Sequence, residues 1–266
     1  MTELHAVSTD ASHESPWPTL RLEAAAAAAE EPVLSGFMNA SVLNHKTLGA
    51  ALAYTLARKL GDGDLNALQA RTVFEEALAA DSGIAEAATE DLLAVYERDP
   101  ACRTYLQPFL YYKGYHALQS YRVAHWLWGE GRETMALHIQ SIVSETFGVD
   151  AHPAATIGKG VMIDHATSVV IGETAQVGDG CSLLHEVTLG GTGARGIDRH
   201  PKLGKGVLVG AGAKVLGPIN IGDEARIAAN SVVLKDVPAR CTVAGVPAKA
   251  VGRCGDRPAE SMDHSL

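Results

Sequence analysis

The chain has 266 residues, of which 47% are hydrophobic and 20% are charged, and its formal net charge is -9 at pH 7. This length allows one large domain or two modest ones with a substantial core, and the negative charge argues against nucleic acid as a partner. The sequence holds no apolar run near the roughly 18 residues that a membrane-spanning helix needs, so we expect no membrane partner.

The N-terminal segment 1–35 is predicted to be a weakly ordered leader. Its first 16 residues are polar and acidic and have no apolar core, so we expect no secretory signal. An alanine run at 24–29 precedes two glutamates and Pro32. The run is compatible with a short helix, but it has no apolar stripe with which to dock.

Residues 36–148 show helical periodicity and are predicted to form an all-α domain of five or six helices. Asp81 provides an N-cap for one helix, which should run to about Glu97. Two further helical segments follow Pro108. Another helix is marked by leucines spaced four residues apart, at Leu48, Leu52, Leu56 and Leu60.

From residue 149 to 253 the period changes to six, as in the hexapeptide repeats of a parallel β-helix. The aliphatic residue of each hexad is expected to point inward, a small residue packs at the corner, and three hexads make one triangular coil. We expect about four coils, or five with the flanking segments. The frame residues are Ile157, Ile163, Ile171, Val177, Leu183, Leu189, Leu203, Val209, Val215, Ile221, Ile227 and Val233.

Two shifts interrupt this frame, by two residues at Val169 and Val170 and by eight residues between Arg195 and Lys202. The second shift belongs to the segment 190–202, GGTGARGIDRHPK, which a coil does not require. The segment predicts either an extruded loop with a function or a tolerated surface insertion. Its length alone does not separate the two.

The four cysteines, at positions 102, 181, 241 and 254, do not form a CxxC pair. We therefore expect reduced thiols in a cytoplasmic protein, without a disulfide framework and without a zinc site. Residues 254–266, which follow the last coil, are expected to form a flexible tail.

The segments YYKGYHALQSYRVAHWLW, VDAHPAATIGKGVMIDHATSVVIGET and VTLGGTGARGIDRHPK, in a helical domain followed by hexapeptide coils, resemble the bacterial serine O-acetyltransferases. The resemblance covers residues from about 40 to 253 and implies that the β-helix is left-handed. It also implies the reaction: the acetyl group of acetyl-CoA passes to the hydroxyl of L-serine, giving O-acetyl-L-serine and CoA, the first step from serine toward cysteine. L-Cysteine is implied as a feedback inhibitor at the serine site.

His165, in the DHAT motif, matches the family's catalytic histidine. The serine hydroxyl needs a base that removes its proton as the new C–O bond forms, and an imidazole with a pKa near 6.5 suits that task. The resemblance assigns Asp150 as the carboxylate that orients this imidazole. The two residues are fifteen apart and one coil has about eighteen, so neighbouring coils are expected to bring them together. His152 and His185 lack such a context and stay outside the predicted site.

The resemblance assigns separate contacts to the two charges of serine. Arg199 is expected to hold the carboxylate through its fork of donors. His200 is expected to bind the carboxylate and to stabilise the developing oxyanion, which makes it a catalytic residue too. Asp99 and Asp164 are expected to hold the ammonium group, with Glu173 as a weaker third. An aspartate before a proline at a helix end is usually a turn residue, so only the resemblance supports Asp99.

Acetyl-CoA is the expected co-substrate, and no metal is expected. It should lie in a groove between neighbouring β-helices, where serine attacks it directly in a ternary complex without an acyl-enzyme. The residues assigned to it are Gly191 and Thr192 near the thioester, Ala211 and Ala229 along the pantetheine arm, and Lys214 near phosphate. Ordinary coil geometry explains the small residues equally well.

The flat faces of the β-helix are expected to form a homotrimer. From the resemblance, the helical domains should join two trimers into a hexamer. Members of the family also dock a C-terminal peptide, usually ending in isoleucine, into O-acetylserine sulfhydrylase. This chain ends in Leu266, so that partnership is left open.

Three other functions fit parts of the pattern. An acyltransferase for sugars or antibiotics shares the hexads but usually lacks the helical domain and the DRHP loop. A β-helix carbonic anhydrase needs three converging histidines, and His165, His185 and His200 are widely spread for that role. A non-catalytic scaffold does not account for Arg199 beside His200.

Overall fold

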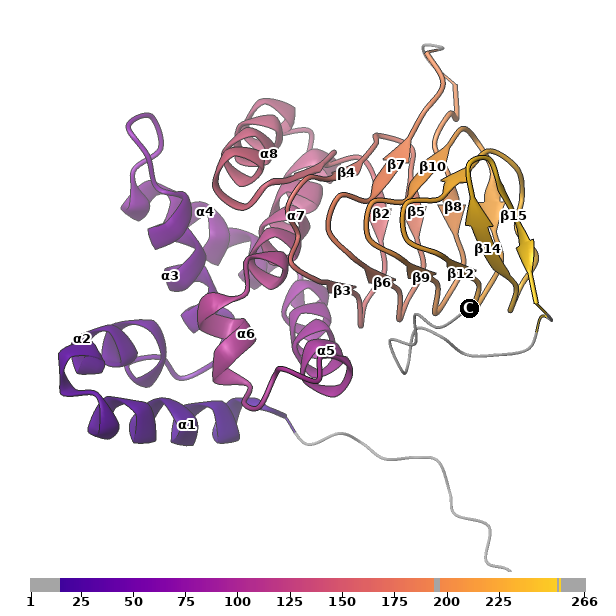
Figure 1. The fold of residues 1–266 in the computed structure, drawn as a ribbon. Helices are drawn as coiled ribbons and strands as arrows, with labels where there is room; N and C mark the ends of the chain where they lie inside the picture. Colours follow the sequence, from indigo (N-terminus) through magenta and orange to yellow (C-terminus); the bar gives the residue numbers. More distant parts are fainter. Residues whose placement is uncertain (1–14, 194–196, 253, 255–266) are drawn as a thin grey trace, which may run out of the picture.

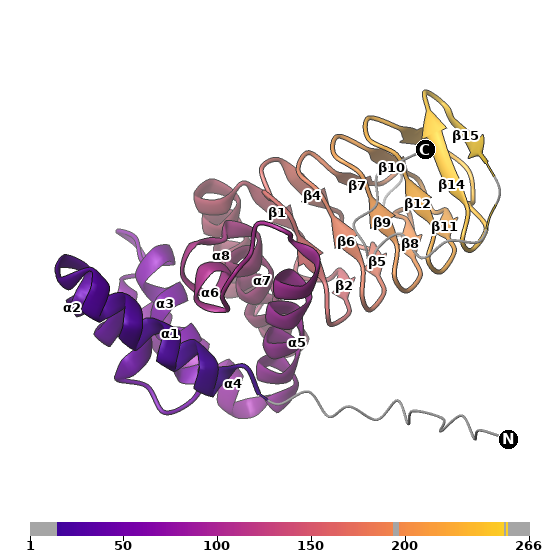
Figure 2. The same cartoon turned by 60° about the horizontal axis from the view of Figure 1, so that its bottom comes forward.

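The structure is a computed structural model that describes residues 15–193, 197–252 and 254. A helical part is followed by a β-helix, and the two lie end to end (Figures 1 and 2). Within the described residues the α-helices are α1 (Trp17–Glu30), α2 (Ser35–Met38), α3 (Leu48–Leu60), α4 (Ala67–Ala80), α5 (Ser82–Arg98), α6 (Leu106–Tyr111), α7 (Lys113–Gly129) and α8 (Glu133–Phe147).

Helix α1 lies inside the segment predicted as a weakly ordered leader, so the structure corrects that prediction for residues 17–35. Trp17, Leu20 and Ala24 are buried in the core of the helical part. The Trp17 indole also donates a hydrogen bond of 3.0 Å to the Lys46 carbonyl oxygen. The alanine run docks although no apolar stripe marks it, because small side chains let helices approach closely. Residues 1–14 lie outside the described part of the chain.

The predicted helix signals agree with the structure. The Asp81 carboxylate accepts a hydrogen bond from the Gly83 amide and caps α5, which ends at Arg98. The four leucines of the predicted stripe lie on α3 and are all buried. None of the described helices is long and apolar enough to cross a bilayer.

The β-helix is a triangular prism whose short parallel strands stack into three sheets, one for each face. The antiparallel hairpin β14–β15 closes its C-terminal end. The first sheet contains β1 (Val149–Ala151), β4 (Val169–Ile171), β7 (Thr188–Gly190), β10 (Lys214–Leu216) and β13 (Val232–Val233). The second contains β2 (Thr156–Ile157), β5 (Gln176–Val177), β8 (Lys202–Leu203) and β11 (Asn220–Ile221). The third contains β3 (Met162–Ile163), β6 (Ser182–Leu183), β9 (Leu208–Val209), β12 (Arg226–Ile227), β14 (Thr242–Gly245) and β15 (Ala248–Val251).

The predicted period of six is confirmed residue by residue. All twelve frame residues are buried, with at most 8% of any of them exposed. Frame residues of successive coils stand in register, as Ile157 does with Val177, and Val177 with Leu203. The second frame shift is a loop that leaves the prism after β7 and returns at β8 (Figure 1). The loop therefore interrupts the wall without disturbing the register of the coils on either side.

Helices α5 and α7 pack on β3, and α8 packs on β1, so the helical part is joined to the first coil. The two parts approach each other closely at Gly114, near the start of α7. A Cβ built on Gly114 would lie 1.9 Å from the Ile163 carbonyl oxygen. Only a residue without a side chain permits this contact, which lies two residues before His165.

A disulfide joins Cys241 and Cys254, so the expectation that all cysteines are reduced is wrong for this pair. The bond links the residue just before β14 to the residue three positions after β15. Cys102 and Cys181 are free and buried, as expected for structural thiols. Apart from Cys254, the predicted flexible tail lies outside the described residues.

Candidate active site

His165 stands at the corner of the prism where the chain turns from β3 to β4. Its φ is 56°, and Ala166 and Ser168 also have positive φ values of 63°. Residues with side chains rarely adopt this left-handed region, so the corner is a specific and strained turn. The first shift of the hexad frame falls here. The imidazole lies outside the prism, with 73% of the side chain exposed.

Asp99, Asp164 and His165 line one pocket of about 750 Å³ between the helical part and the β-helix. An Asp164 carboxylate oxygen lies 3.7 Å from the His165 Nε2 atom. Burial raises the pKa of Asp164, and the negative charge of Asp99 raises it further. Three of the predicted site residues are thus brought together by two different parts of the fold.

Asp99 is both a turn residue at a helix end and a residue that lines the pocket of His165. It is the C-cap of α5, and its carboxylate accepts a 2.8 Å hydrogen bond from the Ala101 amide, as a turn residue does. It also faces the pocket of His165, because the end of α5 leans over the first coil. Tyr112 and Lys113 line the same pocket and were not singled out from the sequence.

His185, which sequence reasoning left outside the site, lies next to His165. The two rings form an edge-to-face pair with centroids 5.6 Å apart, and the buried Nδ1 atom of His185 has no hydrogen-bond partner among the described residues. Each histidine follows a frame residue by two positions, and those frame residues, Ile163 and Leu183, are paired in register. Because both histidines lie two residues after paired frame residues, the hexad spacing itself indicates that His165 and His185 are neighbours.

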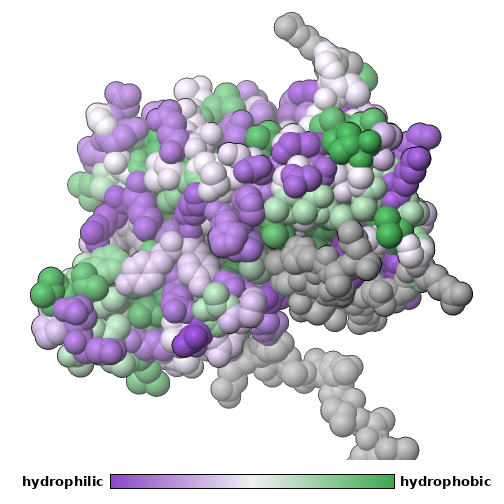
Figure 3. Space-filling view, in the orientation of Figure 1, coloured by the Kyte–Doolittle hydropathy of each residue, from purple (hydrophilic) through white to green (hydrophobic). Residues whose placement is uncertain are grey.

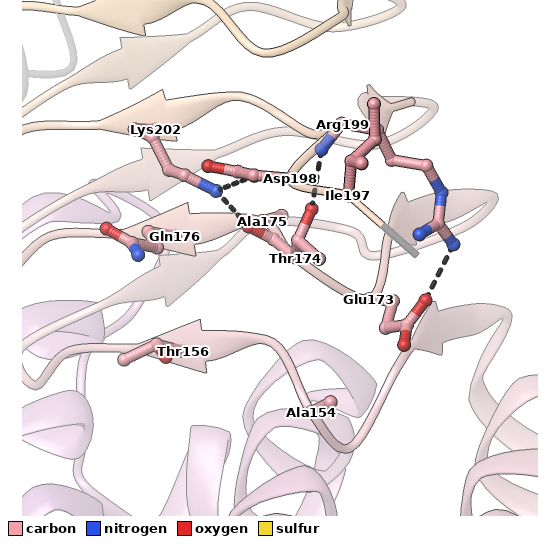
Figure 4. Close-up of a pocket in the computed structure, with 10 residues that line it drawn as sticks. All are labelled: Ala154, Thr156, Glu173, Thr174, Ala175, Gln176, Ile197, Asp198, Arg199 and Lys202. Atoms are coloured by element: carbon pink, nitrogen blue, oxygen red, sulfur yellow. Dashed lines mark hydrogen bonds and ion pairs between the residues drawn. The ribbon is translucent and has the colours of Figure 1, made fainter. Parts of the chain in front are cut away.

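Arg199 and Glu173 meet at a different edge of the prism, between the first and second sheets (Figure 4). The Arg199 guanidinium donates a 2.6 Å hydrogen bond to the Glu173 carboxylate, and this contact lowers the pKa of Glu173. Both residues line a pocket of about 500 Å³ that also includes Asp198 and Lys202. The extruded loop and the corner after β4 therefore form one charged cluster.

Thr174 anchors the loop that carries Arg199 and was not predicted. Its hydroxyl oxygen accepts hydrogen bonds of 3.1 Å from the amides of Arg199 and His200, and its own amide donates to the His200 Nδ1 atom at 3.1 Å. His200 is only 6% exposed, and burial, with a smaller effect of Arg199, lowers its pKa. Its ring packs against Gly172, where a Cβ would lie 2.0 Å from Nε2. Within one chain His200 therefore holds the base of the loop.

Asp150 is not joined to His165 within one chain, which corrects the expectation that neighbouring coils bring them together. Its carboxylate accepts a 2.6 Å hydrogen bond from the Gln140 amide of α8. The two residues line different pockets, and β1 pairs Asp150 with Val170 on the next coil. Asp150 lies within the first sheet, between the edge of His165 and the edge of Arg199.

The residues assigned to acetyl-CoA fall into two groups. Ala211 and Ala229 follow the last residues of β9 and β12 by two positions, as His165 follows β3, so they occupy higher levels of the same edge. The Lys214 ammonium near that edge donates to the Glu186 carbonyl oxygen. Gly191 and Thr192 belong instead to the extruded loop, where the Thr192 amide donates to the Arg199 carbonyl oxygen at 3.2 Å.

Comparisons with known proteins identify the family. The sequence model described as "Serine acetyltransferase, N-terminal" matches residues 17–120, and that of the "Bacterial transferase hexapeptide (six repeats)" matches residues 200–235. The chain is 52% identical over 248 residues to a serine acetyltransferase of Salmonella typhimurium, covering 93% of this chain and 91% of that one. It is 50% identical over 257 residues to serine acetyltransferase 4 of Arabidopsis thaliana, covering 96% of this chain and 72% of the relative.

Solved structures agree with these relatives. The serine acetyltransferase of Neisseria gonorrhoeae superposes with a TM-score of 0.92 at 49% identity, over 96% of this chain and 98% of that one. A serine acetyltransferase in complex with cysteine superposes with a TM-score of 0.93 at 46% identity, over 94% of this chain and 98% of that one. The fold is thus shared over nearly the whole chain, and the chain belongs to the serine acetyltransferase family.

Proposed function

We propose that His165 is the general base with which this member of the family transfers the acetyl group of acetyl-CoA to the hydroxyl of L-serine. The observation that carries the proposal is the exposed imidazole of His165 at a fixed corner, in one pocket with the carboxylates of Asp164 and Asp99. An imidazole can accept a hydroxyl proton near neutral pH as the C–O bond forms. The products are O-acetyl-L-serine and CoA, and the reaction is the first step from serine toward cysteine.

The reaction proceeds by direct attack in a ternary complex. The serine oxygen attacks the thioester carbon while His165 takes the hydroxyl proton. When the tetrahedral intermediate collapses, the C–S bond breaks and the imidazolium returns the proton to the CoA sulfur. An acyl-enzyme on a cysteine is disfavoured, because Cys102 and Cys181 are buried and burial raises the pKa of Cys181 to about 12.

Asp99 and Asp164 hold the ammonium group of serine in this proposal. Their carboxylates share a partly buried pocket, where burial and the negative charge of Asp99 both raise the pKa of Asp164. A cation placed between them relieves that repulsion and compensates for the burial of Asp164. The charge of the pocket therefore supports an amino acid as the acceptor in preference to an uncharged sugar.

Arg199 holds the serine carboxylate, and we place it on a neighbouring subunit. Arg199 and His165 lie at different edges of one prism, and a threefold ring brings an edge of one copy beside a different edge of the next. Asp150, on the face between these edges, can then orient the His165 imidazole of a neighbour. His200 supports the loop of Arg199, and its contact with the oxyanion stays a prediction. The proposed unit is a homotrimer with shared sites.

The edge that carries His165 also offers a track for acetyl-CoA. Ala211 and Ala229 stand above His165 at successive levels, where the lack of large side chains leaves room for a pantetheine arm. Lys214 supplies a positive charge beside the same edge for phosphate. Gly191 and Thr192 reach the thioester from the neighbouring subunit together with Arg199.

Exposed apolar residues at the far end of the helical part support pairing of two trimers into a hexamer. Leu22, Val33 and Leu34 are 73%, 88% and 41% exposed. Figure 3 shows a green patch at this end of the molecule, next to α2. Burying such a patch against a second copy removes apolar surface from water.

L-Cysteine inhibits at the same site in this proposal, because it presents the same ammonium and carboxylate groups as serine. One solved structure of a serine acetyltransferase, 50% identical, is described as a complex with serine, and another, 46% identical, as a complex with cysteine. A cytoplasmic location fits a reaction on free amino acids and CoA. Docking of Leu266 into O-acetylserine sulfhydrylase stays a prediction, since residues 255–266 lie outside the described part of the chain.

The test measures CoA thiol release from acetyl-CoA on addition of L-serine. We expect His165→Ala to lower kcat by at least about a hundredfold, the low end of the contribution of a general base. His138→Ala, on α8 and outside all four pockets described for the chain, is the matched control and should keep its turnover. Unchanged turnover in His165→Ala would remove this residue from the mechanism.

A further inference from the structure

We propose that Arg98 is a positioning residue for serine binding, because it fixes the end of α5 on the second coil and thereby places Asp99 over the pocket of His165. The inference rests on the proposed role of Asp99 in holding the ammonium group. Arg98 does not itself contact serine in this inference but acts through Asp99, which does.

The contacts of Arg98 join the helical part to the β-helix. One guanidinium nitrogen, Nη1, lies 3.1 Å from the Gly180 carbonyl oxygen, 3.4 Å from the Cys181 carbonyl oxygen and 3.3 Å from the Ser182 hydroxyl. Gly180 and Cys181 lead into β6, and Ser182 begins it. A single side chain at the last residue of α5 thus holds three consecutive residues of the second coil.

Asp91, seven residues earlier on the same helix, fixes α5 to the first coil. Its carboxylate is fully buried and accepts a 2.9 Å hydrogen bond from the Val161 amide. It also accepts from Arg122 at 2.7 Å, and that guanidinium donates to the Gly158 carbonyl oxygen at 2.7 Å. Seven residues are two helical turns, so Asp91 and Arg98 face the β-helix from one side of α5. The helix is therefore held at two points on two coils.

The position of Asp99 depends on the second of these points. Asp99 follows Arg98 directly, and its amide makes the last hydrogen bond of α5, to the Val95 carbonyl oxygen at 3.0 Å. Helix ends fray unless their last groups are held, so loss of the Arg98 contacts frees the end of α5 while Asp91 keeps the rest in place. Asp164 and His165 belong to the rigid coil and do not move with it. The distance between the two carboxylates that hold the ammonium group then varies.

This arrangement predicts a selective effect on serine. A contact that binds the ammonium group in both the ground state and the transition state affects KM more than kcat. Acetyl-CoA binds at the edge of Ala211 and Ala229 in the proposed function, away from α5. A merely structural role of Arg98 would instead weaken both substrates together or lower the amount of folded protein.

The experiment compares Arg98→Ala, Arg98→Lys and Lys159→Ala in the full-length protein, with CoA thiol release measured over a range of each substrate. We expect Arg98→Ala to raise the KM for serine about tenfold while the KM for acetyl-CoA stays within about twofold. Arg98→Lys should recover part of the loss, because an ammonium group can still donate to one carbonyl oxygen. Should Arg98→Ala fail to fold, Arg98→Lys carries the same comparison.

Lys159→Ala is the matched control. The Lys159 ammonium also joins α5 to the first coil, through a 2.7 Å ion pair with Glu90, but both side chains are about half exposed. Exposed ion pairs contribute little, so both KM values should stay unchanged. Equal rises of both KM values in Arg98→Ala would overturn the positioning role.

Asp99→Asn separates this inference from the function on which it rests. If Asp99→Asn raises the KM for serine and Arg98→Ala does not, the positioning role is wrong and the role of Asp99 stands. If Asp99→Asn has no effect, the role of Asp99 is wrong, and with it the inference. The double variant with Arg98→Ala and Asp99→Asn should have a KM for serine close to that of Asp99→Asn alone, because Arg98 acts through the Asp99 carboxylate. A KM that multiplies the two single effects would overturn the inference.

Discussion

His165 and Arg199 stand at different edges of the same triangular β-helix. His165 follows β3 at the edge between the third and first sheets, whereas Arg199 lies in the loop between β7 and β8, at the edge between the first and second sheets. The two residues line different pockets of one chain. A serine molecule that is held by both residues therefore requires two subunits.

Mixing two inactive variants tests this shared site. We expect His165→Ala and Arg199→Ala each to have little activity when refolded alone. When the two are denatured and refolded together in equal amounts, about a quarter of the sites should combine an intact His165 with an intact Arg199 from the neighbour. The measurement is the rate of CoA release before and after mixing.

Co-refolding the His165→Ala chain with an Asp164→Ala chain is the control for this experiment. Asp164 and His165 line the same pocket of one chain, so no mixed site receives both of them intact from one edge. Activity should not return in that mixture. If activity returned equally in both mixtures, or returned in neither, the result would contradict a site that is shared between edges of two subunits.

A second prediction concerns Gly114, where α7 touches the first coil. In Gly114→Ala the new methyl group would lie 1.9 Å from the Ile163 carbonyl oxygen, so the helix or the coil must move. We expect a destabilisation of about 1–3 kcal/mol, as for other overpacked sites, and a fall in kcat because Ile163 leads into the corner of His165. Gly129→Ala, at the other end of α7, has no atom within 4 Å of the new Cβ and should unfold at or above the wild-type temperature. Thermal unfolding and turnover of both variants check this.

The coils were predictable because a period of six is a local property of the chain. The position of a residue within its hexad determines whether its side chain points inward. Ile157 and Val215 can therefore be assigned to the core without information about distant residues. The same register explains why His165, Ala211 and Ala229 share an edge, and it would have found His185 beside His165 had offsets from the frame residues been compared.

Contacts between distant segments were not predictable in the same way. Helix α1 carries no apolar stripe, so only the packed core reveals that Leu20 and Ala24 dock. The link between Arg98 and the second coil spans more than 80 residues, and no spacing rule connects them. The proximity of Asp150 and His165 that the coil length suggests does not hold within one chain, because the two residues line different pockets.

A third prediction concerns the pH dependence of stability and depends on His116. Burial lowers the pKa of this histidine from 6.5 to about 4, while its Nε2 atom lies 2.8 Å from the Phe109 carbonyl oxygen. Between these two pKa values the unfolded chain binds more protons than the folded chain, so stability falls as the pH falls below about 6.5. At pH 5 the loss from this group is about 2 kcal/mol.

His116→Gln should flatten this dependence, because glutamine can donate to the same carbonyl oxygen without titrating. The measurement is the urea midpoint of unfolding at pH 7 and at pH 5 for both proteins. Carboxylates contribute equally to the two pH profiles, so the difference between them isolates His116. A fall in midpoint that is as large in His116→Gln as in the wild type would assign the acid sensitivity to other groups.

The disulfide between Cys241 and Cys254 leads to a fourth prediction, about the C-terminal end of the β-helix. Under denaturing conditions without reductant, two thiols per chain should react, those of Cys102 and Cys181, and four should react after reduction. The bond closes a short loop around the β14–β15 hairpin, and loops of about this length stabilise by about 3 kcal/mol. Cys254→Ser should therefore speed proteolysis of the hairpin while proteolysis of the helical part is unchanged. Four reactive thiols before reduction, or equal cleavage rates of the hairpin, would show that the bond does not hold this end of the prism.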